Sequence, residues 1–405
     1  MKKFFQLLAF ILFLGSISPV LAMEEPVYLA IQEEEPVLHE SVEEKSGFGE
    51  WIKEKQNQVE KSKITENAQT IDPLEAEIEY DVLFERTPLL QGFTSMEFEK
   101  GPIATFKPFV GYQGVLNFDF MSDSVFKSDY ESSFVEIGLT GDFRNQPISY
   151  NIVLEALPQG DSNYFRTFIK DYSLIFKYIP NNKIYVGRFR TPIGFEGGVS
   201  SYTTPFITRS QISRNFGGIR AQGTKIVGDY KFADYNIGVT STDRSHSKFF
   251  PGVEFNGWVN LKPLGNTDGR YGKLKIGGGL NAGHNEFDYN VVGAYLSYKF
   301  RKFALESEYA ISNGSNGGAG LTRNKAQGVY TTLSYNITKK LQVLARYDFF
   351  DADRTVSGNK SSEYTAGINY FIKGSALKLM LNYTYRQSDY EKNSNRIMLG
   401  TQILF

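Results

Sequence analysis

The chain has 405 residues, a formal net charge of only -1 and no cysteine, and its mean hydropathy is -0.32. The missing cysteine excludes a disulfide-stapled scaffold, and the low hydropathy does not fit a bundle of membrane helices. With 33 Phe and 25 Tyr, the chain is also richer in aromatic residues than the apolar core of an ordinary soluble domain.

The first residues predict a secretory signal peptide. Lys2 and Lys3 precede an apolar run over residues 4–14, and Ala22 closes a segment of small and modest side chains. We predict a signal peptide over residues 1–22, cleaved after Ala22. The alternative, a membrane anchor, is disfavoured because the run is too short for a bilayer core of about 30 Å, and no other stretch holds 18 uninterrupted apolar residues.

Charge divides the rest of the chain into two parts. Residues 23–100 contain 20 acidic and 7 basic side chains, a net of -13, which leaves +10 for residues 101–405. Nine Glu and one Lys lie within residues 24–50, a composition that opposes a packed core. We expect residues 23–100 to form an acidic periplasmic extension, mostly flexible, with a short helix or coiled-coil piece near residues 50–66. A solvated linker is the alternative.

From residue 101 onwards the sequence alternates between two faces, as strands do. In residues 377–386, for example, Leu and Tyr alternate with mostly polar residues. An apolar face towards lipid and a polar face towards water is typical of an outer-membrane barrel. The predicted strands lie at residues 105–119, 132–143, 148–156, 168–179, 183–190, 217–228, 231–241, 253–261, 273–280, 292–300, 303–309, 329–335, 341–349, 364–372, 376–386 and 396–405.

The predicted fold is therefore an all-β, transmembrane antiparallel β-barrel of about 16 strands, within two, over residues 101–405. Backbone groups in lipid must be satisfied internally, so the sheet must close on itself, and sixteen strands leave an aqueous lumen. Tight turns near residues 301, 336–338 and 374 alternate with longer polar segments. Short periplasmic turns and long external loops are the rule in such barrels.

The last strand carries a second signal. Ile397, Leu399, Thr401, Ile403 and Phe405 share one face, and the chain stops on the aromatic residue. This ending resembles the terminal signal of bacterial outer-membrane barrels. The resemblance implies that the barrel-insertion machinery reads Phe405 and that the protein resides in the bacterial outer membrane.

The long connection over residues 191–216 is the candidate functional segment. Its neighbourhood contains five arginines and one acid, Glu196. Alternation places Arg188 and Arg190 opposite Tyr185, Gly187 and Phe189, so we expect the arginines to face the lumen, because a guanidinium in lipid costs about 2–4 kcal/mol. The predicted pore-lining, anion-binding residues are Arg188, Arg190, Arg209, Arg214, Arg220, Lys273 and Lys275.

Other charged residues share the expected inward phase, and they leave ordinary ion pairs inside the lumen open as an alternative. The further basic candidates are Lys299, Arg346, Lys378 and Arg386, and the acids in the same phase are Glu306, Glu308 and Asp348.

The segment VGRFRTPIGFEGGVSSYTTPFITRSQISRNFGGIRAQG, residues 186–223, resembles the phosphate-selective porin O and P family. That family shows a Gly-aromatic-basic-Thr-Pro pattern leaving a strand, then an acid, an aromatic-Ile-x-Arg-Ser segment and an Asn/Asp-Gly-x stretch. The resemblance implies a homotrimeric, sixteen-stranded, anion-selective channel whose third loop folds into the pore, with basic residues along a phosphate path. The matching residues are Gly187, Phe189, Arg190, Thr191, Pro192, Glu196, Phe206, Ile207, Arg209, Ser210, Asn215 and Gly217.

These observations favour a porin that passes small anions such as phosphate or polyphosphate by passive diffusion. A general porin and a structural tether acting through the acidic extension are the alternatives. An enzyme is disfavoured, because none of the three histidines, His39, His246 and His284, belongs to a recognisable catalytic pattern with Ser or Asp. We expect no cofactor, no metal cluster and no nucleic-acid partner, and we expect outer-membrane lipid around the barrel.

Overall fold

The computed structural model describes residues 95–121, 126–156, 168–244, 248, 250–267 and 269–405. The chain separates into two units, Met1–Glu75 and Ala76–Phe405, and every described residue belongs to the second. The predicted signal peptide and the helix near residues 50–66 lie outside the described residues. Only residues 95–100 of the acidic extension are described, and no described helix is long and apolar enough to cross a membrane.

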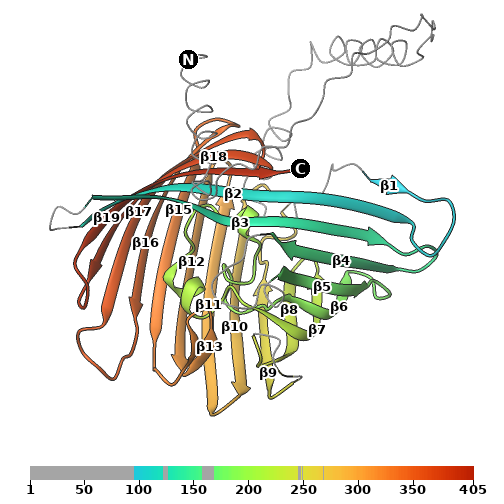
Figure 1. The fold of residues 1–405 in the computed structure, drawn as a ribbon, viewed down its shortest axis with the longest axis horizontal. Helices are drawn as coiled ribbons and strands as arrows, with labels where there is room; N and C mark the ends of the chain where they lie inside the picture. The colour runs from blue at the N-terminus through green and yellow to red at the C-terminus, as the bar shows by residue number, and fades with distance from the viewer. Residues whose placement is uncertain (1–94, 122–125, 157–167, 245–247, 249, 268) are drawn as a thin grey trace, which may run out of the picture. The chain divides into compact units, whose positions relative to one another are not determined.

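Sixteen antiparallel strands form one closed sheet in the described part of the chain (Figure 1). Each strand pairs with the next along the chain, and the last pairs with the first, from Ser394↔Met121 to Leu404↔Gly111. The barrel strands are β2 (Thr105–Met121), β3 (Phe126–Asp142), β4 (Ile148–Glu155), β5 (Ile169–Phe176), β6 (Asn182–Arg190), β7 (Arg220–Asp229), β8 (Ala233–Ser241), β9 (Val253–Leu261), β10 (Lys273–His284), β11 (Asp288–Phe300), β12 (Phe303–Asn313), β15 (Gln327–Asn336), β16 (Leu341–Asp351), β17 (Lys360–Lys373), β18 (Leu377–Ser388) and β19 (Ser394–Leu404).

Each of the sixteen predicted strands overlaps one of these strands, so the predicted barrel is confirmed. Five short elements were not predicted. They are β1 (Met96–Glu97), which pairs with β2, the two strands β13 (Ser315–Gly317) and β14 (Gly320–Thr322), the 3₁₀ turn η1 (Ser201–Thr203) and the helix α5 (Gln211–Asn215).

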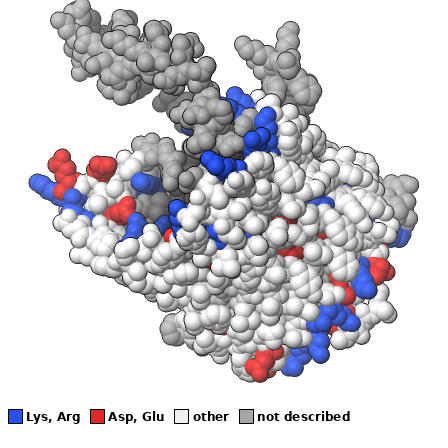
Figure 2. Space-filling view, turned by 180° about the vertical axis from the view of Figure 1, so that it is seen from behind, with Lys and Arg blue, Asp and Glu red and all other residues white. Residues whose placement is uncertain are grey.

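The barrel is apolar outside and polar inside. On β17, Tyr364 and Ile368 are exposed on the outer surface, whereas Glu363, Thr365 and Asn369 on the alternate face are buried. Much of the surface in Figure 2 is correspondingly free of charged residues. A soluble protein has the opposite distribution, with polar residues outside and apolar residues inside. A barrel surrounded by lipid and filled with water requires apolar residues outside and polar residues inside.

The two ends of the barrel differ in their connections. The turn end holds the connections 143–147, 177–181, 230–232, 262–272, 301–302, 337–340 and 374–376. The loop end holds 122–125, 156–168, 191–219, 242–252, 285–287, 314–326, 352–359 and 389–393, some of whose residues lie outside those described. The predicted alternation of short and long connections is confirmed from residue 301 onwards, where it was assigned; before that, 262–272 at the turn end is long, and 122–125 and 285–287 at the loop end are short.

The carboxy-terminal residue takes part in barrel closure. The Phe405 amide donates to the Val110 carbonyl at 2.9 Å, and the Val110 amide donates back at 2.6 Å. The Phe405 side chain is 64% exposed, at the turn end. Its recognition by insertion machinery stays a prediction.

We expect a charge on the outer surface to destabilise the barrel according to its depth. Leu296, exposed in the middle of β11, should cost about 2–4 kcal/mol when changed to Arg, because the guanidinium meets hydrocarbon. Leu261, the last residue of β9 at the turn end, should cost about 0–1 kcal/mol for the same change. Equilibrium unfolding in lipid vesicles measures both, and equal costs would contradict the assignment of the outer surface.

Candidate functional site

Residues 191–219, which connect β6 to β7, lie inside the barrel; we call them the constriction loop (light green in Figure 1). The Ile207 amide donates to Asn382 Oδ1 on β18 at 2.9 Å, and Asn369 on β17 donates to the Pro205 carbonyl at 2.8 Å. Both wall residues are buried on the inner face. The loop therefore narrows the lumen, as predicted from its resemblance to the family.

Two apolar clusters fix the constriction loop to different parts of the wall. Ile193, Ile212 and Phe216 pack with wall residues of β11, β12, β15 and β16. Tyr202 packs in a second cluster with residues of β2, β3, β4 and β19. These contacts remove apolar side chains of the loop from the aqueous lumen, which anchors it by the hydrophobic effect.

Tyr202 also makes a polar contact at this wall. Its hydroxyl donates to Glu136 Oε2 at 2.5 Å. Burial, followed by the negative charge of Glu136, raises the pKa of the Tyr202 hydroxyl. The hydroxyl therefore keeps its proton at neutral pH and remains a donor to Glu136.

Buried carboxylates satisfy backbone amides of the loop. Glu308 accepts hydrogen bonds from the amides of Phe195 at 2.9 Å and Glu196 at 3.3 Å. Asp348 accepts from the Gln211 amide at 2.7 Å, and Glu196 itself accepts from the Ser210 amide at 2.7 Å. A loop enclosed in a barrel needs such partners, because a buried amide without an acceptor costs free energy.

Inward cations satisfy carbonyls of the same loop. Arg346 donates to the Thr208 carbonyl at 3.0 Å and lies 3.8 Å from a Glu196 carboxylate oxygen. Lys378 donates to the Thr204 carbonyl at 3.1 Å. Both side chains are buried on the inner face, so their predicted inward orientation is confirmed. Their contacts position the loop.

Three of the predicted site arginines contact nearby acids or backbone. Arg209 donates to the carbonyls of Glu196 and Val199, the latter at 2.8 Å. Arg214 forms an ion pair of 2.7 Å with Glu363 on β17. Arg220 forms an ion pair of 2.8 Å with Asp171 on β5.

Arg188 and Arg190 occupy less regular positions on β6. Arg188 is 8% exposed and donates to the Lys170 carbonyl at 3.0 Å, while Arg190 donates to the Gly197 carbonyl of the constriction loop at 3.5 Å. Gly187, directly before Arg188, has a φ of 134°, a backbone conformation that L side chains rarely adopt.

The expected separation of aromatic and basic faces on β6 is wrong for Phe189. Its ring is 4% exposed, and the Lys225 ammonium of β7 lies 4.6 Å from its centre and 5.0 Å from that of Tyr185. Phe189 is still paired with Ala221 of β7, and its ring centre lies 6.4 Å from that of Tyr185 on the same face of β6, so the alternation holds and the assignment of this face to lipid is what was wrong. Lys225 was missed because it lies on the other face of β7 from Arg220, together with Gly223 and Val227.

Lys273 and Lys275 lie apart from the arginines along the wall, at the turn-end start of β10. Lys273 is exposed, and Lys275 forms an ion pair of 2.9 Å with Asp234 on β8. The predicted seven-residue set is therefore not gathered into one ring.

A second connection also reaches inward. The hairpin of β13 and β14 packs against α5, where the Ala319 amide donates to the Asn215 carbonyl at 3.2 Å. Asn316 is buried and donates to the Thr242 carbonyl at 2.9 Å, and Arg244 donates to the Asn316 carbonyl at 2.9 Å. We call residues 314–326 the brace hairpin, because it supports the constriction loop from the loop end.

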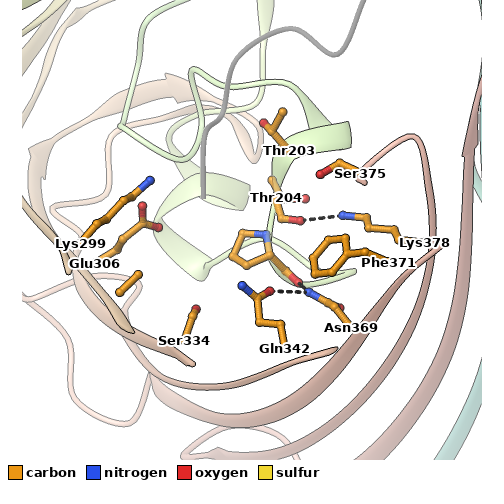
Figure 3. Close-up of a pocket in the computed structure, with 12 residues that line it drawn as sticks. Thr203, Thr204, Lys299, Glu306, Ser334, Gln342, Asn369, Phe371, Ser375 and Lys378 are labelled. Carbon is orange, nitrogen blue, oxygen red and sulfur yellow. Dashed lines mark hydrogen bonds between the residues drawn. The ribbon is translucent and has the colours of Figure 1, made fainter. Parts of the chain in front are cut away.

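A cavity of about 40 Å³ lies between the constriction loop and the wall (Figure 3). Its charged lining residues are Lys299, Glu306 and Lys378. This volume admits only a few water molecules. Among the described residues no group of three or more His, Cys, Asp or Glu is placed to hold a metal ion.

The model of the phosphate-selective porin O and P family matches residues 259–404. The predicted resemblance is thus confirmed, and over a different part of the chain from the segment that suggested it. No match was found among curated proteins.

Solved porins share the fold. An anion-selective porin from Comamonas acidovorans has 14% identity and a TM-score of 0.55, covering 74% of this chain and 99% of its own. OmpT of Vibrio cholerae, in its trimer form, has 12% identity and a TM-score of 0.52, covering 74% and 99%. Salmonella typhi OmpF, in complex with daunomycin, has 12% identity and a TM-score of 0.55, covering 77% and 100%.

The family match and the fold locate the protein in the bacterial outer membrane. They support an outer-membrane channel, and they point to a channel rather than an enzyme.

Glu308 provides a test of loop anchoring. Changing Glu308 to Ala removes both acceptors for the amides of Phe195 and Glu196, and we expect the loop to lose about 3 kcal/mol of local stability. Single-channel recordings should then show a larger and noisier conductance. Glu308→Gln, which keeps one acceptor oxygen, should lie between this variant and the wild type. Identical traces for all three proteins would contradict the anchoring role.

Gly317 tests the brace hairpin. A Cβ at this position would lie 2.2 Å from the Asn215 carbonyl oxygen and 2.6 Å from the Phe216 Cα, so Gly317→Val must displace the backbone of one segment. We expect a loss of about 1–3 kcal/mol and altered conductance. Thr322→Ser, at a partly exposed position of the same hairpin, keeps the hydroxyl that accepts from the Asn324 amide; it is the control and should leave both properties unchanged.

Proposed function

We propose, on the premise of the porin architecture and the match to the phosphate-selective porin O and P model, that this protein is a passive diffusion channel for small anions. Phosphate or polyphosphate is the proposed solute. The solved anion-selective porin with the same fold supports the general direction of this proposal.

A group of cations beside the constriction loop carries the proposal. Arg190, Arg209, Arg220 and Lys225, here called the cationic cluster, come from β6, the loop and β7. Arg190 lies within electrostatic range of Arg209 and Arg220, and Lys225 lies within range of Arg190 and Arg220. Like charges gathered in this way repel one another, so an anion between them is attracted.

The contacts of the cluster leave part of its charge uncompensated. Arg220 is paired with Asp171, but Lys225 donates to the Arg190 carbonyl at 3.0 Å and Arg190 donates to the Gly197 carbonyl. Neither Arg190 nor Lys225 forms an ion pair with a described residue. Backbone carbonyls orient these two cations and leave their charge to act on solutes.

Such an arrangement suits transport better than tight binding. A guanidinium offers a planar pair of donors to phosphate oxygens, and an ammonium offers a point charge. Conduction requires that an anion enters favourably and still leaves, which partly exposed cations permit. The anchored constriction loop would force a passing anion close to the cluster.

A general, weakly selective porin is the second candidate. Many inward cations already have acidic partners: Lys170 pairs with Glu136 and Glu155, and Arg214 pairs with Glu363. Where pairing is local, the net field in the lumen is small, and size alone selects solutes.

Three further assignments complete the proposal. We propose a homotrimer, supported by the trimer form of the solved Vibrio cholerae protein with this fold. We also propose that Phe405 is read by the insertion machinery, and that the acidic residues 23–100 act in the periplasm, where they could tether the membrane.

Reversal potentials in planar bilayers test anion selection. The double variant Arg190→Gln, Lys225→Gln keeps hydrogen-bond donors for the carbonyl contacts but removes two positive charges. We expect the ratio of anion to cation permeability to fall at least threefold. Lys275→Gln, paired with Asp234 near the turn end, is the control and should change it little. Cation preference in the wild type would overturn the proposal.

Conductance in phosphate against chloride tests the solute. If phosphate binds transiently at the cationic cluster, conductance should saturate with phosphate concentration and rise linearly with chloride. The double variant should lose the saturation. Linear behaviour with both salts would favour the general porin.

A further inference from the structure

The two ends of the barrel differ sharply in charge. The seven turn-end connections together contain nine Lys or Arg and one Asp, whereas the loop-end connections contain nine Lys or Arg and eight Asp or Glu. Six of the seven turn-end connections hold at least one basic residue, and the seventh directly follows Lys373. Basic side chains therefore encircle the turn end, and we call them the basic ring.

Figure 2 shows part of the charge distribution on one face. Blue residues gather near the top, and blue and red residues mix at the lower right and at the left edge. The region between them is mostly white. The ring therefore borders the apolar surface that faces lipid.

Exposed apolar and aromatic residues lie among the basic ones. Tyr230 and Phe232 flank Lys231 and are 41% and 52% exposed, and Tyr335 and Ile337 precede Lys339 and are 48% and 44% exposed. Aromatic belts mark the level of the lipid headgroups in membrane barrels. The basic ring accordingly lies at headgroup level.

The ring is only partly neutralised by the protein. Lys177 pairs with Asp142, and Lys262 pairs with Asp229 and Asp234. Lys231, Lys340 and Lys373 are exposed and form no ion pair with a described residue. Their charge and the neighbouring apolar groups together match an amphipathic anion that has a phosphate head and acyl tails.

We infer that the basic ring binds anionic phospholipid headgroups of the adjoining leaflet. This inference goes beyond the proposed channel function, because the ring lies on the rim of the barrel and not at the constriction loop. Free phosphate shares the headgroup chemistry but has no acyl tail for the exposed Tyr230, Phe232 and Tyr335. That difference favours a phospholipid over free phosphate as the ligand. The two ligands are distinguished below by comparing lipid retention with ion selectivity.

The test uses the full-length protein in vesicles of phosphatidylglycerol and phosphatidylcholine at a 3:7 ratio. Native mass spectrometry then counts the lipids that remain bound after gentle extraction. The wild type should retain phosphatidylglycerol at least threefold above its share in the vesicle. The variant Arg301→Gln, Lys302→Gln, Lys339→Gln, Lys340→Gln should lose this enrichment.

A matched control removes the same number of charges at the loop end. The variant Lys248→Gln, Arg323→Gln, Lys325→Gln, Lys392→Gln should keep the enrichment, because its side chains lie at the opposite end. Absence of enrichment in the wild type, or equal loss in both quadruple variants, would overturn the inference. Resistance of the folded barrel to detergent unfolding verifies that each variant is intact.

Reversal potentials of the same variants, in bilayers of phosphatidylcholine alone, separate lipid binding from anion attraction. The turn-end variant should keep the wild-type ion selectivity. If it loses selectivity and still retains phosphatidylglycerol, the ring acts on permeating anions and the inference fails. Failure of the anion-channel proposal itself would leave the lipid enrichment unchanged, so the two outcomes are distinguishable.

Discussion

Closure of the sheet is the constraint on which the rest of this structure depends. In hydrocarbon a backbone amide or carbonyl finds no water, so each must be paired within the protein. Sixteen strands achieve this because β19 pairs with β2 along eleven register positions. Closure in turn fixes which residues face lipid and which face the lumen, and it places the long β6–β7 connection inside a confined space.

The constriction loop solves the same problem without a sheet. Its amides and carbonyls cannot all pair within so short a helix as α5, so charged residues of the wall replace the missing partners. Glu308 and Asp348 accept from amides, and Arg346 and Lys378 donate to carbonyls. From the sequence alone, inward acidic and basic side chains are assigned to solute binding. Several of them instead form hydrogen bonds with the backbone of the constriction loop, and only the remaining ones can act on a solute.

The sequence predicted all sixteen strands because a two-residue period is local and needs no knowledge of partners. The same period correctly predicted that the side chains of Arg346 and Lys378 face the lumen. The partners of the arginines could not be predicted, since Arg214 and Glu363 are 149 residues apart and meet only through barrel closure. Phe189 was misplaced because the period shows which residues share a face but not which face meets lipid, and the face that Phe189 shares with Tyr185 was assigned to lipid.

The distribution of anchors along the constriction loop has a mechanical consequence. A hollow sheet of this size would flatten towards an ellipse under lateral pressure from the bilayer. Tyr202 is fastened near Glu136 on β3, while Phe195 is fastened to Glu308 on β12, several strands around the circumference. A segment held at both places acts as an internal strut, so the cross-section of the cylinder and the width of its passage resist deformation together.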